Sequence, residues 1–248
     1  MDPQLMKATL EVDDHHWWYR GRRRIIRAEL DRLPLTPAAR VLDAGCGSGR
    51  TLEELVDYGD PSGIELDEDA AGLASARGIA EVQVGRLEQL PWPTETFDLI
   101  TCLDVIEHIA DDRVALAELR RVCKPGGFML LTVPAYQALW SLHDDANHHH
   151  RRYSRRSLSA AVTGAGWSVV RMSSFNTVLL APAAAIRLGQ RRFGTRNGYT
   201  TDLDLGPRWL NNALEQPLRF EAGWLRRGRT LPAGLSLLAV LRKPWTDA

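Results

Sequence analysis

The amino-acid sequence predicts an α/β fold built around a parallel sheet. Short apolar runs alternate with segments of helical periodicity between about residues 40 and 133, and such alternation is typical of βαβ units. The run at 41–49 (VLDAGCGSG) passes from an apolar strand into a glycine-rich loop that opens a helix. With 248 residues, the chain is long enough for one large domain with an appended cap.

The predicted elements follow one another in a regular order. A first helix spans 15–32 and ends before Pro34 and Pro37, because proline does not continue a helix. A Pro-Gly-Gly run at 125–127 predicts a turn between a helix and a strand. The alternating part is expected to contain strand 40–44, helix 49–58, strand 61–66, helix 68–77, strand 81–84, strand 97–103, helix 111–122 and strand 127–133.

The last third of the chain departs from this alternation. Helix 154–165 and strand 167–172 continue the pattern, and LSLLAVLR at 235–242 is expected to form a final strand. The insert at 174–230 is too long for a plain connection. It is expected to build a cap or a contact surface within the same domain, because prolines interrupt it and the sheet is completed only after it.

Composition narrows the classes of function. The 31 basic and 31 acidic residues give a formal net charge of +0, which argues against a general electrostatic attraction to nucleic acid or to an anionic membrane. Cys46, Cys102 and Cys123 are far apart and match neither a zinc site nor a disulfide framework. Residues 1–16 are polar and acidic and are not expected to form a signal peptide. No apolar run reaches the ~18 residues of a membrane span. We expect a cytoplasmic protein.

The glycine loop indicates the type of ligand. Gly45, Gly47 and Gly49 stand at every second position after Asp43. A dinucleotide fingerprint requires G-x-G-x-x-G, and neither register of this loop supplies its third glycine. The pattern is instead D-x-G-x-G-x-G, which resembles the first motif of class I S-adenosylmethionine (SAM)-dependent methyltransferases. Four further segments up to residue 133 resemble that family in the same order.

The resemblance implies a Rossmann-like, doubly wound, mostly parallel sheet of seven strands, with an antiparallel last strand and a helical cap insert. It also implies one methyltransferase domain over 1–248, with an N-terminal helical cap at 1–37 and a SAM-binding core at 38–173. The cap insert and the final strand complete that domain.

By the same resemblance, Asp43 pairs with the ammonium group of SAM, beside Ala44, Gly45 and Gly47. A fixed carboxylate suits a cationic ammonium group. The alternative is a helix-capping aspartate. Glu65 is expected to accept hydrogen bonds from the ribose hydroxyl groups, with Leu66 next to it.

The third-strand segment, GRLEQLPWPTETFD at 85–98, departs from the family where it usually has an acidic contact to adenine. Arg86 stands there, so the backbone of Leu87 or Glu88 is expected to supply the contact. The next strand leads to Leu103 and Asp104, whose backbone is expected to line the methionine end of SAM. His108 closes this segment as a candidate base, or as a residue that orients local structure.

A histidine-rich segment at 139–158 (LWSLHDDANHHHRRYSRRSL) resembles a subgroup of bacterial methyltransferases. His143 and His149 are the candidate bases, and Asp144 is a candidate to orient a histidine. Arg152 and Tyr153 are expected to hold the segment in place. Two alternatives stay open: a metal site, although no strong zinc spacing is present, and a polar loop without a catalytic role.

The N-terminal run HHWWYRGRRR resembles the same subgroup. Its Trp18 and Tyr19 are expected to cover bound SAM, since a cation over an aromatic face is favourable. The alternative is hydrophobic packing of the first helix onto the sheet.

Together these features predict a SAM-dependent methyltransferase that acts on oxygen or nitrogen of a small molecule, as in natural-product biosynthesis, with a possible homodimer. The alternatives are a SAM-binding enzyme of another chemistry on the same fold and a non-catalytic SAM-binding partner subunit. A nucleic-acid methyltransferase is disfavoured, because LDVIEH follows the fourth strand where N/D-P-P-Y/F would be expected.

Overall fold

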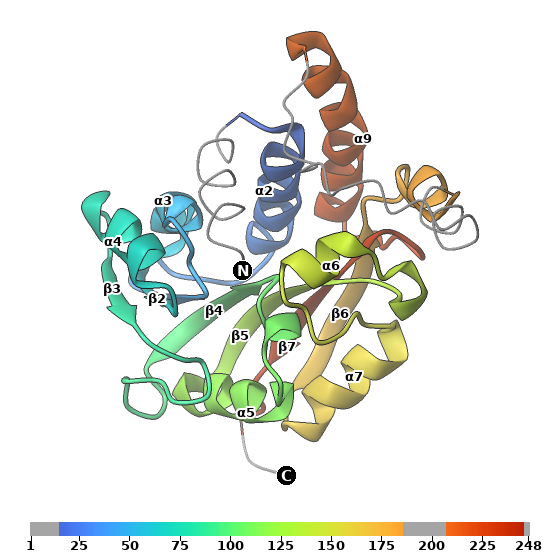
Figure 1. The fold of residues 1–248 in the computed structure, drawn as a ribbon. Coiled ribbons are helices and arrows are strands. Elements are labelled where there is room, and N and C mark those ends of the chain that lie inside the picture. Colours follow the sequence, from blue (N-terminus) through green and yellow to red (C-terminus); the bar gives the residue numbers. More distant parts are fainter. Residues whose placement is uncertain (1–14, 186–206, 246–248) are drawn as a thin grey trace. The chain divides into compact units, whose positions relative to one another are not determined.

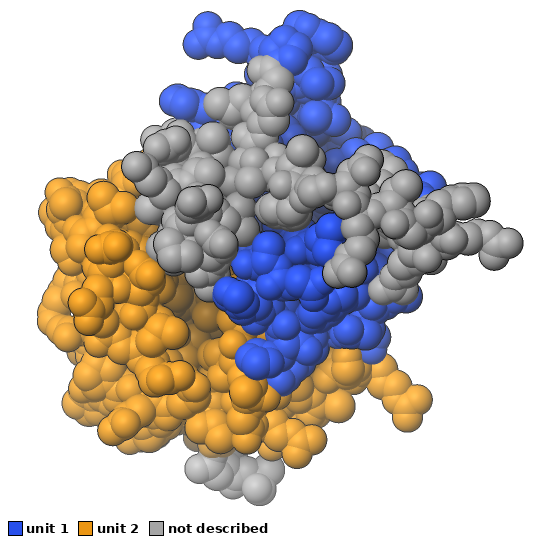
Figure 2. Space-filling view, viewed as in Figure 1, with its two compact units in different colours: residues 1–32, 134–154, 173–237 blue, residues 33–133, 155–172, 238–248 orange. Residues whose placement is uncertain are grey.

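A computed structural model of the protein describes residues 15–185 and 207–245. Its chain divides into two compact units (Figure 2). Unit 1 contains Met1–Arg32, Pro134–Ser154 and Ser173–Leu237, whereas unit 2 contains Leu33–Val133, Arg155–Met172 and Leu238–Ala248. Each unit is therefore assembled from three separate stretches of chain. The expected domain boundaries at 37, 173 and 230 stay predictions.

A seven-stranded sheet forms the centre of the fold, with strand order β3-β2-β1-β4-β5-β7-β6 (Figure 1). The strands are β1 (Arg40–Ala44), β2 (Asp60–Glu65), β3 (Glu81–Val84), β4 (Phe97–Leu103), β5 (Cys123–Pro134), β6 (Ser168–Phe175) and β7 (Ser236–Arg242). From β1 the chain first builds outward through β2 and β3, and then returns to place β4 and β5 on the other side of β1. This reversal is a topological switch point, where open α/β sheets bind ligands.

Strand directions agree with the expected fold class. β1 pairs in parallel with β2 and with β4, and β4 pairs in parallel with β5. β7 runs antiparallel to β5, because the Gly126 amide donates to Lys243 O and the Ala135 amide donates to Leu235 O. The mostly parallel sheet with an antiparallel last strand is confirmed.

The helices of unit 2 bury apolar faces on an apolar sheet. They are α3 (Arg50–Leu55), α4 (Glu68–Ala76), α5 (Asp112–Val122) and α7 (Arg155–Gly164). α5 illustrates the local signals: Asp111 caps its first turn by accepting from the Arg113 amide, and the helix buries Ala115, Leu116, Leu119 and Val122. These residues recur at helical spacing, so one face of α5 is apolar.

Unit 1 is built around the packing of α2 (Trp17–Leu30) against α9 (Arg208–Arg226). The two helices lie side by side in Figure 1. Gly21 makes the close approach possible, since a Cβ at this position would lie 2.2 Å from Leu218 Cδ1. Glu215 is buried on α9 and receives the guanidinium groups of Arg20 and Arg24 from α2. None of the described helices is long and apolar enough to cross a membrane.

Three local predictions were wrong or incomplete. The Pro-Gly-Gly run at 125–127 lies inside β5, although Gly126 has a φ of 76°. The helix expected at 49–58 ends as α3 at Leu55 and continues as the 3-10 turn η1 (Val56–Tyr58). The histidine-rich segment is not a plain loop, since it contains the 3-10 turn η3 (Gln137–Leu139) and α6 (Leu142–Ala146). The insert contains α9, and its residues 186–206 lie outside the described residues.

Candidate functional site

The glycine loop after β1 is folded as its spacing predicts. Gly45, Gly47 and Gly49 all have positive φ, at 80°, 53° and 79°, a conformation that glycine adopts without a Cβ penalty. A Cβ at Gly45 would lie 2.5 Å from Val105 Cγ2, so this position admits only glycine. A Cβ at Gly47 would meet nothing within 4 Å. The loop therefore packs closely at Gly45 and leaves open space at Gly47.

Asp43 lies at the end of β1 and is only 2% exposed. Its Oδ1 accepts a 2.6 Å hydrogen bond from the hydroxyl of Thr101, which is its register partner on β4. The N-cap of α3 is Gly49, without a side-chain cap, so the alternative of a helix-capping aspartate is wrong for Asp43. A buried carboxylate fixed at a switch point is suited to a cationic ligand group.

Glu65 closes the glycine loop from the neighbouring strand. Its Oε2 accepts from the Gly47 amide at 2.9 Å, and its Oε1 accepts from the amides of Leu66 and Asp67 at 2.8 and 3.1 Å. A carboxylate offers about four acceptor positions. Glu65 therefore orders the loop and retains acceptor capacity for a hydroxyl group of a ligand.

The residues proposed near adenine differ in exposure. Leu66 is 59% exposed. Leu87 is buried. Glu88 lies 4.0 Å from the Arg86 guanidinium. This ion pair gives Arg86 a partner of its own at the position where the family usually carries an acid.

The turn after β4 is shaped by an unusual backbone. Asp104 has a φ of 58°, a region that few non-glycine residues enter, and its amide donates to Thr132 O at 3.0 Å. Leu103 is buried at the end of the strand. The turn brings Val105 against Gly45. The ends of β1 and β4 are therefore joined through this contact, as a site at the carboxyl edge requires.

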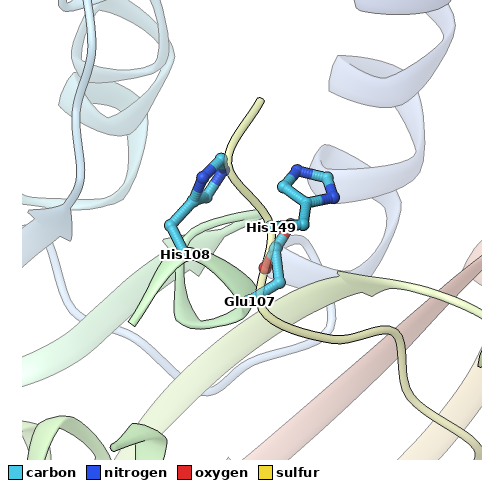
Figure 3. A group of neighbouring side chains, drawn as sticks. All are labelled: Glu107, His108 and His149. Carbon is cyan, nitrogen blue, oxygen red and sulfur yellow. The ribbon is translucent and has the colours of Figure 1, made fainter. Parts of the chain in front are cut away.

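Glu107 and His108 lie on the 3-10 turn η2 (Ile106–His108), as Figure 3 shows. Glu107 is buried, and burial together with the charge of Glu107 raises the pKa of the Cys102 thiol well above its usual value. The His108 amide donates to Val105 O at 3.0 Å, which closes the turn. His149, the third side chain in Figure 3, belongs to the segment after β5 in unit 1.

The segment after β5 holds a buried charged cluster. Asp144 is completely buried, and its Oδ1 lies 2.9 Å from His149 Nδ1 and accepts from Arg152 Nε at 2.7 Å. Its Oδ2 accepts from the Ser141 amide at 2.8 Å. Burial favours a raised pKa for Asp144, but the hydrogen bonds from His149 and Arg152 outweigh it and hold the pKa well below its usual range. Asp144 is therefore an ionised acceptor for both neighbours.

Arg152 and Tyr153 hold the segment as the sequence predicts. Arg152 donates its amide to Gln137 Oε1 at 2.9 Å and one guanidinium nitrogen to Ala135 O at 3.2 Å. The Tyr153 amide donates to Pro134 O at 2.9 Å. His143 lies edge-on to His149, with the ring centroids 6.2 Å apart. Asp144 thus contacts one of the two candidate bases through its carboxylate, and that base is His149.

The aromatic start of α2 packs within unit 1. Trp18 stacks on Phe175 with ring centroids 5.9 Å apart and an interplanar angle of 11°. Tyr19 meets the ring of His16 edge-on at 5.9 Å, and His16 Nδ1 accepts from the Trp18 amide. Trp18 therefore packs against β6, in agreement with the alternative of hydrophobic packing onto the sheet. Cofactor contact by Trp18 and Tyr19 stays a prediction.

Sequence reasoning missed Thr101. Its role depends on the register between β1 and β4, which pairs it with Asp43. Threonine is common in strands, and nothing in the local pattern distinguishes Thr101 from other buried threonines. The site in unit 2 is thus assembled from the ends of three neighbouring strands, with Asp43 on β1, Glu65 on β2 and Thr101 on β4.

Comparison with known proteins decides the family. Residues 17–172, more than half of the chain, match a family model described as a methyltransferase domain. The chain belongs to this methyltransferase family. It contains a methyltransferase domain of the class that uses SAM as cofactor. The open space at Gly47 and the acceptor groups of Asp43 and Glu65 suit such a cofactor.

Two relatives are each 30% identical to the matched part of this chain. A 37.1 kDa protein in transposon TN4556 of Streptomyces fradiae is 30% identical over 213 residues, which cover 76% of this chain and 61% of that protein. Malonyl-(acyl-carrier protein) O-methyltransferase of Enterobacter lignolyticus is 30% identical over 174 residues, which cover 66% of this chain and 69% of that enzyme. The match thus spans less than two thirds of the Streptomyces protein.

A solved structure supports the fold. It is a methyltransferase in complex with the Trm112 methyltransferase activator from Haloferax volcanii, and it superposes with a TM-score of 0.64. The sequence identity is 20%, and the superposition covers 98% of this chain and 99% of that chain. At this identity the likeness concerns the fold alone.

Proposed function

We propose that this methyltransferase transfers the methyl group of SAM to a hydroxyl or amine group of a small molecule, with His149 as the general base. The observation that carries the proposal is the bond between His149 Nδ1 and the buried Asp144 carboxylate. The segment that contains both residues leaves the sheet after β5, which ends at Pro134. β1, β4 and β5 run in parallel, and ligands bind at the carboxyl ends of such strands.

The charge state of Asp144 determines the tautomer of His149. Asp144 is ionised, because its hydrogen bonds lower its pKa, and an ionised carboxylate only accepts hydrogen bonds. The hydrogen atom between them therefore belongs to His149 Nδ1. In the neutral ring, Nε2 is then the unprotonated nitrogen, which can accept a proton. Asp144 also stabilises the positive charge that His149 acquires.

The proposed reaction needs little else from the protein. SAM supplies an electrophilic methyl group when it is bound. Asp43 and Glu65 would hold the cofactor by its ammonium and ribose groups. Leu66 and the backbone of Leu87 or Glu88 would lie toward adenine, and the backbone of Leu103 and Asp104 would border the methionine end. His149 removes the proton from the acceptor as the acceptor attacks. Alignment of the acceptor and exclusion of water contribute the rest of the rate enhancement.

The role of His149 is tested by comparing His149→Ala with His143→Ala. Release of S-adenosylhomocysteine is measured over a panel of phenols, alcohols, amines and carboxylic acids. We expect His149→Ala to lower turnover about 10²-fold or more, as the loss of a general base does, and S-adenosylhomocysteine affinity to stay unchanged. His143→Ala is the matched control with near-normal turnover. If turnover falls in His143→Ala alone, the general base is His143 instead. If both variants turn over normally, His108 remains the candidate base.

Two controls distinguish the remaining alternatives. Carboxylic acids are ionised at neutral pH and require no base, so a preference for them that survives His149→Ala contradicts the proposal. Added chelator lowers activity only if the histidine segment binds a catalytic metal. Another chemistry on the same fold would consume the acceptor without releasing S-adenosylhomocysteine.

Three broader features of the proposal concern the whole protein. A homodimer is expected to appear as twice the chain mass of 27.7 kDa in sedimentation. A cytoplasmic location is tested by cell fractionation. The insert at 174–230 is proposed to cap the acceptor, and substitutions in it are expected to change the choice of acceptor while S-adenosylhomocysteine affinity is retained. The neutral net charge supports a small-molecule acceptor over nucleic acid.

A further inference from the structure

The hydroxyl of Thr101 donates a hydrogen bond to the carboxylate of Asp43. Thr101 lies on β4, is completely buried, and is the direct register partner of Asp43. Its Oγ1 lies 2.6 Å from Asp43 Oδ1 and 3.3 Å from Leu42 O. A hydroxyl has one proton to donate, and 2.6 Å is the length of a charge-assisted bond to a carboxylate. The proton is therefore donated mainly to Asp43.

We propose that Thr101 is a positioning residue for cofactor recognition, which acts by holding the Asp43 carboxylate in the orientation that binds the ammonium group of SAM. This inference rests on the proposed role of Asp43 and is independent of the role of His149. A carboxylate that is already fixed loses no rotational freedom when it binds a cation, and such preorganisation increases affinity. Thr101 itself does not touch the ligand.

The chain offers a matched control in the next strand. Thr132 lies on β5, next to β4, and is also completely buried. In contrast with Thr101, its Oγ1 has no hydrogen-bond partner within the described residues. The bond from the Asp104 amide to Thr132 uses the backbone carbonyl and is kept when the side chain changes. Thr101→Val and Thr132→Val therefore make the same chemical change at two buried strand positions.

Two ligands separate a positioning role from a general structural one. S-adenosylhomocysteine carries the ammonium group, whereas 5′-methylthioadenosine retains the adenine, the ribose and the sulfur atom but lacks the amino-acid part. Loss of the correct Asp43 orientation affects only the ligand with the ammonium group. A distortion of the glycine loop or the sheet affects both ligands.

The experiment measures the dissociation constants of both ligands by calorimetry for Thr101→Val, Thr101→Ser, Thr132→Val and the unmodified chain. We expect Thr101→Val to bind S-adenosylhomocysteine about tenfold more weakly, because the Asp43 carboxylate is no longer held in its binding orientation. Its affinity for 5′-methylthioadenosine is expected to stay unchanged. Thr101→Ser keeps the hydroxyl and is expected to restore the affinity, and Thr132→Val is expected to match the unmodified chain.

Several results would overturn the inference. Unchanged binding of S-adenosylhomocysteine by Thr101→Val contradicts it, and equal weakening of both ligands assigns Thr101 a structural role. If Thr101→Val does not fold, Thr101→Ala removes the same hydroxyl and is measured in its place. Asp43→Ala separates the role of Asp43 from that of Thr101. If Asp43→Ala weakens S-adenosylhomocysteine but Thr101→Val does not, only this inference fails. If Asp43→Ala has no effect, the proposed role of Asp43 fails as well.

Discussion

The two units of the molecule are stabilised in different ways. Among the twelve largest fully buried side chains of the described residues, nine lie in unit 2 and three in unit 1. Unit 1 instead joins distant stretches of chain by buried polar groups. Glu215 on α9 binds Arg20 and Arg24 on α2, and Glu221 accepts from the amides of Asn176 and Thr177. Burial raises the pKa of Glu221, although these amides act in the opposite direction.

This difference has a physical consequence. An apolar sheet core tolerates many substitutions of similar volume, whereas a buried charge depends on every one of its partners. Unit 1 is therefore expected to be the more sensitive to removal of single polar groups, and unit 2 to lose cofactor binding before it loses stability.

The largest effect is expected for Asp144→Ala. The change leaves the buried guanidinium of Arg152 without its carboxylate, and removal of one partner of a buried ion pair costs about 3–5 kcal/mol. The free energy of unfolding is measured by urea denaturation. The double variant Asp144→Leu with Arg152→Met removes both charges and is expected to recover most of the loss. A loss below about 1 kcal/mol in Asp144→Ala would contradict the dependence of unit 1 on this cluster.

The same cluster predicts a pH dependence. The folded-state pKa of Asp144 lies below its usual value, so Asp144 contributes its full stability above its unfolded pKa of about 3.9, and the contribution is lost as pH falls through the lower folded pKa. The difference in unfolding free energy between the unmodified chain and Asp144→Ala should thus shrink as pH falls below about 4. A difference that shrinks near pH 6 would indicate another titrating group.

Asp43→Ala should separate binding from stability in unit 2. Loss of a charge-assisted bond is expected to weaken S-adenosylhomocysteine by about 1.5–3 kcal/mol, as measured by calorimetry. Thr101 retains Leu42 O as an alternative acceptor at 3.3 Å, so the unfolding free energy should change by less than the binding free energy. A larger loss of stability than of affinity would show that Asp43 serves mainly the fold.

Two helix glycines of unit 1 give the smallest effects, and the effects have opposite signs. Gly21→Ala places a Cβ against Leu218 on α9, and such overpacking is expected to cost about 1–3 kcal/mol. Gly223→Ala, within α9, meets no atom within 4 Å and should gain about 0.5–1 kcal/mol from helix propensity. Thermal unfolding of both variants measures the difference. A gain for Gly21→Ala would contradict the close packing of α2 and α9.

The sequence predicted strand boundaries correctly where the local residue pattern alone sets them. Strands 40–44, 81–84 and 97–103 match β1, β3 and β4 residue for residue. The turn expected at 125–127 was wrong for a physical reason. Gly126 has the left-handed backbone of a turn residue, but its amide pairs with Lys243 O. That partner stands more than 100 residues later in the chain, and no local signal contains it.

The candidate site likewise contains features that the local sequence sets and features that only the tertiary structure sets. By itself the sequence determined the conformation of the glycine loop, because glycine adopts positive φ without a Cβ penalty. It also determined that Asp43 and Glu65 are carboxylates at strand ends, because each ends a recognisable strand. Only the tertiary structure decided that Thr101 holds Asp43, and that Asp144 contacts His149 through its carboxylate. These pairings depend on strand register and on the turn between α6 and Arg152. Packing of the whole chain sets both, so the local order of residues does not specify them.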